Sequence, residues 1–130
     1  MNERNGFTVI ELIVLILVVS VAGILTWSQI NHIEIASRDD KRRTAINAFY
    51  YALEEVYYPA HASYPKTLDE KILPSVDVAL FSDPHGVKLG EAKSNYRYEP
   101  TNCDISTCKS YTLRGLLEAE SDYVKKSRNK

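Results

Sequence analysis

Hydrophobic positions are concentrated in one uninterrupted stretch near the start of the chain. From Leu12 to Ile33 there is no Asp, Glu, Lys or Arg, and 16 of the 21 residues in 7–27 are apolar. About 20 such residues span the hydrocarbon core of a bilayer as a helix. Val and Ile predominate here, but in lipid a helix satisfies its own backbone hydrogen bonds and an isolated strand does not. The pattern therefore predicts a membrane-spanning helix over 7–33.

Behind this stretch the apolar positions change to the spacing of an amphipathic helix. Four apolar residues recur at intervals that place them on one helical face: Ile46, Phe49, Leu53 and Val56. Pro59 is the first proline, and it predicts the end of the helix because it disfavours helical geometry at Tyr58. We therefore expect one helix from Phe7 to about Tyr58, roughly 75–80 Å long at 1.5 Å per residue. Its front half must bury its surface outside its own chain.

The rest of the chain alternates turn-forming segments with short apolar stretches. The segment 82–86 reads Ser-Asp-Pro-His-Gly and predicts a tight turn. A short helical turn capped by Thr67 is expected near 68–73, and a frayed basic tail at 125–130. Strands are expected at 95–99 and 109–117 around a hairpin-like excursion at 100–108, with a third short strand around 86–89. Because two strands alone are marginal, the predicted fold class is α+β, with the long N-terminal helix packed against a small antiparallel sheet.

Composition limits the function. The chain has 130 residues and a formal net charge of −1, which gives no overall sign of nucleic-acid binding. The histidines, His32, His61 and His85, are expected at the membrane edge or in loops, and the acidic residues are too dispersed for an acid–base pair. Asp83 is a turn residue or a calcium ligand, and its Pro-x-Gly surroundings favour the turn. We therefore expect no enzyme, no metal and no cofactor.

Glu11 is the only acidic residue within the apolar segment 7–27. A carboxylate inside hydrocarbon is costly and marks a functional site by default, although a shallow position near the interface would also explain it. A cleaved secretory signal fits poorly, because its apolar core is usually about 7–15 residues long and is followed by a small-x-small site. No such site follows Trp27.

The string Gly6-Phe7-Thr8-Val9-Ile10-Glu11-Leu12 resembles the processing and assembly motif of type IV pilins and type II secretion pseudopilins. In that family a prepilin peptidase cuts after the glycine, here Gly6. The new N-terminal residue, here Phe7, is then usually N-methylated. The glutamate four residues further on, here Glu11, is implicated in subunit assembly.

This resemblance implies a pilin-like fold organised in three parts. They are a leader removed by the peptidase (1–6), a transmembrane and filament-core helix (7–33), and a soluble head that includes the rear half of the helix (34–130). Before assembly the subunit would lie in the cytoplasmic (inner) membrane, and afterwards in an extracellular or periplasmic filament. Its partners would be other pilins, the prepilin peptidase, and the inner-membrane assembly platform with its ATPase.

The expected function is structural, as a major or minor subunit of a type IV pilus or a related filament that serves motility, adhesion or secretion. Two alternatives stay open. A competence pilin would take up DNA, with nucleic acid as a partner bound by tyrosines beside cations such as Lys109 and Arg114. A single-pass membrane-anchored binding domain would keep its leader and never polymerise.

The segment 38–43, Arg-Asp-Asp-Lys-Arg-Arg, carries a run of mixed charge directly behind the apolar stretch. Such runs usually solvate one face of a helix, which here would form a collar beyond the membrane. The alternative is a zone of salt bridges between subunits of a filament.

Cys103 and Cys108 are the two cysteines of the chain and enclose four residues. In an exported body, two nearby cysteines most simply form a disulfide, which would staple the excursion between the strands as it does in many pilins. Free thiols and a metal site are the alternatives. A metal site would also need His61 or His85, and the spacing is not that of a zinc module.

Overall fold

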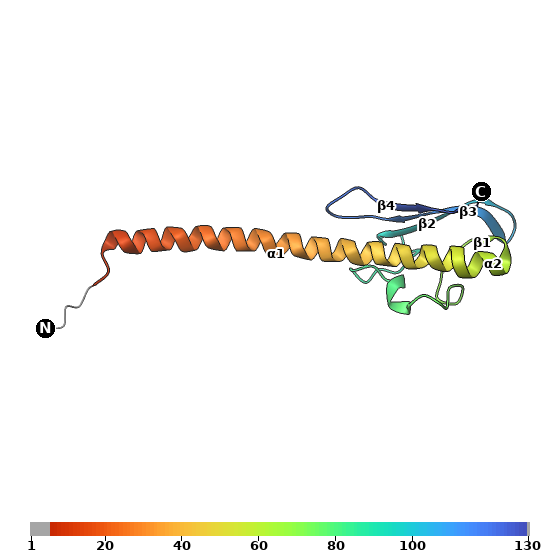
Figure 1. Cartoon of the computed structure of the whole chain (residues 1–130), viewed down its shortest axis with the longest axis horizontal. Coiled ribbons are helices and arrows are strands. Elements are labelled where there is room, and N and C mark those ends of the chain that lie inside the picture. The colour runs from red at the N-terminus through yellow and green to blue at the C-terminus, as the bar shows by residue number, and fades with distance from the viewer. Residues whose placement is uncertain (1–5, 130) are drawn as a thin grey trace. The chain divides into compact units, whose positions relative to one another are not determined.

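A computed structural model describes residues 6–129 of the chain. The chain divides into two units, 1–34 and 35–130, of which we call the second the head unit. The helix α1 (Val9–Tyr51) begins in the first unit and ends in the second. Figure 1 shows this long N-terminal helix followed in the chain by a small antiparallel sheet, so the α+β class predicted from the sequence is confirmed. Apart from Gly6, the predicted leader lies outside the described residues.

The helical segment continues further than the sequence predicts. A π-helix η1 (Ala52–Tyr57) and the short helix α2 (Tyr58–His61) follow α1 directly, and Tyr58 keeps helical backbone angles of φ −61° and ψ −42°. The prediction that Pro59 ends the helix at Tyr58 is therefore wrong. Proline is tolerated in the first turn of a helix, and Pro59 occupies that position in α2. The segment ends at Ala62, which has a left-handed conformation with φ 51°.

The π-helix changes which side chains face the core. Ile46, Phe49 and Leu53 are buried, as one amphipathic face requires. Val56 belongs to the same predicted face but is 54% exposed, whereas Glu54 is only 6% exposed. Each hydrogen bond of a π-helix spans one more residue than in an α-helix, so successive residues rotate by less than the usual 100°. The slower rotation turns Glu54 inward and Val56 outward.

Strand β3 is the centre of the sheet. It pairs antiparallel with each of the other strands, and the bounds are β1 (Tyr64–Pro65), β2 (Tyr96–Cys103), β3 (Thr107–Gly115) and β4 (Tyr123–Lys126). The ladder between β2 and β3 runs from Tyr96 opposite Gly115 to Cys103 opposite Cys108. Since β2 occupies one edge of β3, the short strands β1 and β4 share its other edge.

The predicted strands at 95–99 and 109–117 correspond to β2 and β3, but their lengths differ from the prediction. β2 ends later in the chain than predicted and β3 begins earlier, so the excursion expected at 100–108 is reduced to a tight turn at 104–106. The prediction of a strand at 86–89 is wrong, because Lys88 makes only an isolated bridge with Ser82. Its backbone is engaged instead in the turn that Asp83 organises.

Two further local predictions need correction. The basic tail is not frayed along 125–126, because β4 pairs with β3 and Lys125 lies 5.3 Å from the centre of the Tyr50 ring. The segment 68–73 forms the expected single helical turn, in which the N–H of Leu73 donates to the carbonyl of Asp69 at 3.1 Å, but Asp69 rather than Thr67 caps it. Asp69 accepts hydrogen bonds from two backbone N–H groups of this turn. Pro74 follows directly and prevents a longer helix, and the short helix of this region is the 3-10 helix η2 (Val78–Phe81).

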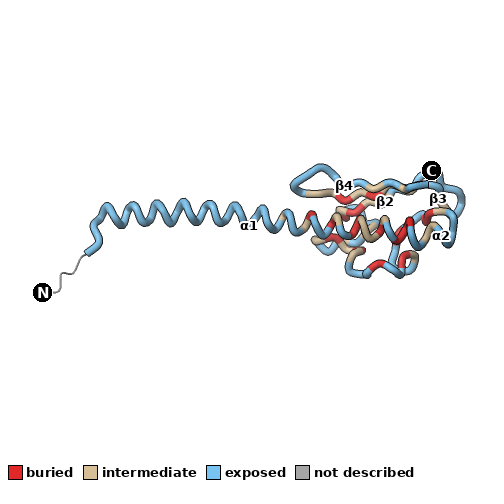
Figure 2. The backbone as a smooth tube through the Cα atoms, viewed as in Figure 1, coloured by how far each residue is buried: buried red, intermediate tan, exposed pale blue. Residues whose placement is uncertain are grey.

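The core of the head unit lies between the rear of α1 and the sheet. Phe49 stands at its centre, with its ring 5.0 Å from that of Phe81 and 6.1 Å from that of Tyr96. Tyr64 and Tyr111 are also buried, with ring centres 4.7 Å apart. Figure 2 shows that the buried positions belong to this unit. A unit of this size can bury only a small core, and large aromatic side chains supply much of it.

Candidate functional site

The apolar part of α1 is not covered by any other part of the chain that the structure describes. Every residue in 6–34 is exposed, including large apolar side chains such as Ile10 (71%), Ile24 (71%) and Trp27 (74%). Among the described residues, one helix is long and apolar enough to cross a membrane. An apolar surface of this extent is unfavourable in water. The segment therefore needs either lipid or other apolar chains around it.

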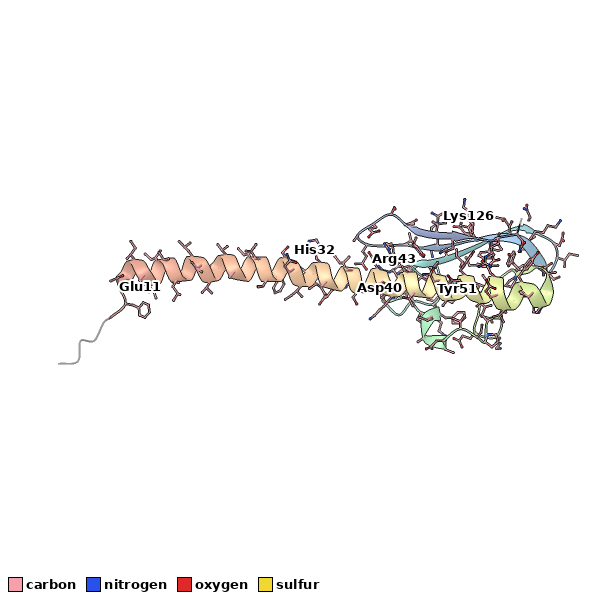
Figure 3. All side chains as sticks on the ribbon, viewed as in Figure 1. Glu11, His32, Asp40, Arg43, Tyr51 and Lys126 are labelled. Carbon is pink, nitrogen blue, oxygen red and sulfur yellow. A yellow bond between two sulfur atoms is a disulfide. The ribbon has the colours of Figure 1, made fainter. Side chains whose placement is uncertain are left out.

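The start of α1 is capped by a side chain that the sequence analysis did not assign. The hydroxyl oxygen of Thr8 accepts a hydrogen bond from the backbone N–H of Glu11 at 3.3 Å. This Thr-x-x-Glu spacing is that of a helix capping box, and it places Glu11 in the first turn, near the positive end of the helix dipole. Figure 3 shows Glu11 at this end of α1. The cap also accounts for an acidic residue at this position without any partner subunit.

The proposed cleavage position lies just ahead of this cap. Gly6 and Phe7 precede the helix and are not in regular secondary structure. Phe7 is 75% exposed, and a Cβ built on Gly6 meets nothing within 4 Å. The described residues therefore leave the Gly6–Phe7 bond uncovered. Gly6, Phe7 and Glu11 lie together at one end of the apolar helix, as their sequence spacing requires.

Hydroxyl groups inside the apolar segment are satisfied by the helix itself. The Ser20 hydroxyl donates to the carbonyl of Ile16 at 2.7 Å, and the Thr26 hydroxyl lies 2.9 Å from the carbonyl of Gly23. Such bonds to the preceding turn remove much of the cost of placing a hydroxyl in an apolar environment. Ser20 and Thr26 therefore do not prevent this segment from entering a membrane or an apolar filament core.

The mixed-charge run 38–43 is solvated only in part, because Asp40 and Lys41 are exposed but Asp39 and Arg42 are buried. Arg42 is fully buried, and its guanidinium donates to Asp39 at 2.6 Å and to Glu118 at 2.6 Å. Arg38 donates to the other oxygen of Glu118, also at 2.6 Å. Asp39 in turn accepts the backbone N–H groups of Glu118 and Ala119 at 2.9 and 3.0 Å. This buried ion network ties α1 to the loop between β3 and β4.

Only one contact of this ion network is indicated by a local sequence pattern. Asp39 and Arg42 are three residues apart on a helix, a spacing that favours an ion pair. Their partner Glu118 is 76 residues beyond Arg42, and no local pattern indicates that it returns to this helix. The pairs of Arg38, Asp39 and Arg42 described above are all made within one chain.

The network makes the stability of the head unit depend on pH. Hydrogen bonds from Arg38 and Arg42 lower the pKa of Glu118 from 4.5 to about 2. Burial alone would raise the pKa of Asp39, but hydrogen bonds from the backbone of Ala119 and Glu118 outweigh it and lower that pKa. A lowered pKa in the folded state stabilises the fold above the unfolded pKa, and this contribution is lost as pH falls toward the folded value.

We therefore expect the melting temperature of the protein to fall as pH is lowered from about 5 to about 2. Glu118→Gln should lower stability at neutral pH by about 1.5–3 kcal/mol and should flatten the acid dependence. Thermal melts followed by circular dichroism at a series of pH values test this. Glu120→Gln is the matched control, because Glu120 is 65% exposed in its pair with Arg43 and should change little. Equal acid dependence in wild type and Glu118→Gln would contradict the assignment.

A second buried carboxylate lies where the π-helix turns it inward. Glu54 accepts the hydroxyls of Tyr111 at 2.8 Å and Tyr64 at 3.1 Å, and the backbone N–H of Arg128 at 3.2 Å. Burial and hydrogen bonding to Glu54 raise the pKa of Tyr111 above its ordinary value, which keeps this hydroxyl a donor. The Arg128 guanidinium pairs with the neighbouring Glu55 at 2.6 Å. Glu54 therefore attaches the end of the chain to the core.

The cysteines are joined as the sequence analysis expects. A disulfide links Cys103 and Cys108, which face one another across β2 and β3. The backbone N–H of Asp104 donates to the carbonyl of Thr107 at 2.8 Å and closes the turn. At its tip, Ile105 is 97% exposed.

Asp83 is engaged in the predicted turn. Its carboxylate accepts the backbone N–H groups of His85 and Val87 on one oxygen and that of Asn95 on the other, at 2.9–3.0 Å. Gly86 adopts φ 81°, as a glycine at such a turn readily does. In the part of the chain that the structure describes, no three His, Cys, Asp or Glu side chains form a group that could hold a metal ion.

No protein-family model, curated protein or solved structure matches the chain. The fold and the site define it as an α+β protein with a disulfide and with one helix long and apolar enough for a single membrane crossing.

Proposed function

We propose that the protein is a structural, non-catalytic subunit of a type IV pilus or a related filament such as a pseudopilus. The observation that carries this proposal is the exposed, uncharged part of α1, which begins directly after the segment from Gly6 to Glu11. A surface of this kind can be covered by lipid before assembly and by the same helix of other subunits afterwards. The likeness of the segment from Gly6 to Glu11 to the prepilin motif supports packing against other subunits after assembly, as well as insertion in lipid before it.

Cleavage after Gly6 would create a new charged group, the amino terminus, at the start of the apolar helix. The new amino group of Phe7 would be cationic, and a lone charge within packed apolar helices is very costly unless it is paired. The Glu11 carboxylate of a neighbouring subunit can supply that pair. Within one subunit Phe7 and Glu11 are also four residues apart, so an internal pair competes. The pair between subunits would set the axial register of the helices in the filament.

The head unit suits this role in size and in rigidity. Its buried ion network holds the loop between β3 and β4 to the helix, and its disulfide joins the ends of β2 and β3. We do not extend the proposal to DNA uptake, because the chain has a net charge of −1 and so no basic excess, and because two of the three described cations that lie over tyrosine rings have acidic partners. Arg43 pairs with Glu120, and Arg128 pairs with Glu55.

The state of the N-terminus tests the proposal. The full-length chain is produced with and without a prepilin peptidase, and the intact mass of the membrane-extracted protein is measured. With the peptidase we expect loss of residues 1–6 and addition of one methyl group to Phe7. Gly6→Val should keep the leader. Gly23→Ala is the matched control, since an added Cβ there meets nothing within 4 Å, and it should be processed like wild type.

An intact leader in the presence of active peptidase would contradict the pilin proposal. That result would instead favour a single-pass anchored domain, whose apolar helix stays permanently in the bilayer.

A further inference from the structure

The turn between β2 and β3 presents an apolar side chain on a rigid support. Ile105 is 97% exposed, although tight turns ordinarily carry Gly, Asn, Asp or Ser. The disulfide beside it and the hydrogen bond between Asp104 and Thr107 fix the turn. A fixed apolar side chain loses little conformational freedom when it enters a pocket. We call the turn 104–106 the tip.

Another surface of the head unit carries an apolar groove. Two hollows of about 360 and 220 Å³ share the side chains of Leu68 and Leu89 in their walls. The larger is also lined by Tyr96 and Tyr98, and the smaller by Phe81. Both open to the surface, and together they offer space for an aliphatic side chain. Ile105 does not occupy this groove in its own chain, because it is almost fully exposed.

Charge at the tip complements charge at the groove. Asp104 stands next to Ile105, and among the described residues it has no ion-pair partner. The larger hollow is lined by Lys66 and Arg97 against one acidic residue, Glu91. Lys66 likewise has no ion-pair partner among the described residues, and Arg97 donates to backbone carbonyls rather than to a carboxylate. The tip thus pairs an apolar anchor with an anion. The larger hollow of the groove combines apolar walls with a basic excess, whereas the smaller hollow is lined by equal numbers of acidic and basic residues, Asp69, Glu70, Lys71 and Lys88.

We propose that the tip of one copy of this chain docks in the groove of a second copy, with Ile105 between Leu68 and Leu89 and Asp104 facing Lys66. The tip and the groove are different surfaces, so the contact is heterologous, and a heterologous contact propagates without closing into a dimer. This geometry is what a filament needs. The inference rests on the proposed function in that a filament holds many copies side by side.

Photo-crosslinking of the full-length chain tests the contact. Ile105 is replaced by benzoylphenylalanine, and illuminated filaments are digested and mapped by mass spectrometry. We expect copy-to-copy crosslinks that end at Leu68, Leu89 or their neighbours in the groove. The same probe at Val78 is the matched control, because Val78 is an exposed apolar residue that lines neither hollow. It should not label the groove.

Exchanging the charges of Asp104 and Lys66 distinguishes a specific contact from nonspecific hydrophobic association. Asp104→Lys or Lys66→Glu alone should lower the yield of the groove crosslink about two- to fivefold, and the two together should restore it. Both side chains are exposed, so neither change threatens the fold. Crosslinks unaffected by either single change would overturn the proposed pairing of Asp104 with Lys66.

Electron microscopy of the same samples separates this contact from the subunit role. Filaments whose Ile105 crosslinks lie outside the groove, or on a different protein, overturn the contact and leave the subunit role intact. Groove crosslinks between detergent-solubilised copies that never form filaments support the contact and count against the subunit role. Failure of Ile105 to link two copies in either sample overturns the contact.

Discussion

Arg42→Met is expected to lower the free energy of unfolding by about 3–5 kcal/mol, because it removes the cation from a buried ion network. Asp39, which is 5% exposed, would be left as a buried carboxylate without its cation. Glu118 would keep its partly buried pair with Arg38 and its contact with His85 at 3.6 Å. Small domains have about 5–15 kcal/mol of stability in total, so the variant should be close to unfolding at physiological temperature. Chemical denaturation of the detergent-solubilised protein, followed by circular dichroism, measures the loss.

Arg43→Met is the matched control for this experiment. Arg43 is the next residue of the same helix, and its pair with Glu120 is exposed, so its removal should cost about 0–1 kcal/mol. A loss at Arg42 no larger than at Arg43 would show that the buried network contributes nothing beyond a surface pair. The Arg42 Nε atom has no hydrogen-bond partner among the described residues, so the network is costly to bury even when intact.

Glu11→Gln is expected to abolish filaments under conditions in which the parent protein forms them. The amide keeps the size of the side chain and can still be accommodated in the first turn behind the Thr8 cap. It removes the negative charge, so the Phe7 amino group of a cleaved neighbour would be buried among apolar helices without a partner. Negative-stain electron microscopy of sheared surface filaments gives the readout.

Processing and folding must be checked in the same sample of this variant. The intact mass should show that residues 1–6 are removed as in the parent, which separates an assembly defect from a cleavage defect. Asp40→Asn is the matched control, since Asp40 is an exposed acid of α1 in the head unit and its loss should leave filaments unchanged. Normal filaments from Glu11→Gln would remove the charge pair from the proposed assembly mechanism.

The parts of the fold that follow from local periodicity could be predicted. The uncharged stretch predicts a membrane-length helix, and the spacing of Ile46, Phe49 and Leu53 predicts the face that packs on the sheet. The prediction is wrong at Val56 because the π-helix breaks the 3.6-residue period. No residue type in that segment indicates a π-helix.

Features that depend on distant partners could not be predicted. Lys125 reads as part of a basic tail, but in the fold it pairs with Leu113 of β3 and lies over the rings of Tyr50 and Tyr123, so it belongs to strand β4. The ion network depends in the same way on Glu118, which no local pattern relates to Arg42. The candidate site differs, because Gly6, Phe7 and Glu11 are local in sequence, so their position together at one end of the apolar helix could be predicted.

The π-helix has a consequence for any comparison of this helix with a regular one. Relative to an unbroken α-helix, η1 (Ala52–Tyr57) amounts to one inserted residue. An alignment with a straight helix therefore needs a single-residue gap within this segment. Without the gap, every later helical position up to His61 is matched out of phase by one residue. Outward positions such as Val56 would then be equated with core positions, and the buried carboxylate Glu54 with a surface residue.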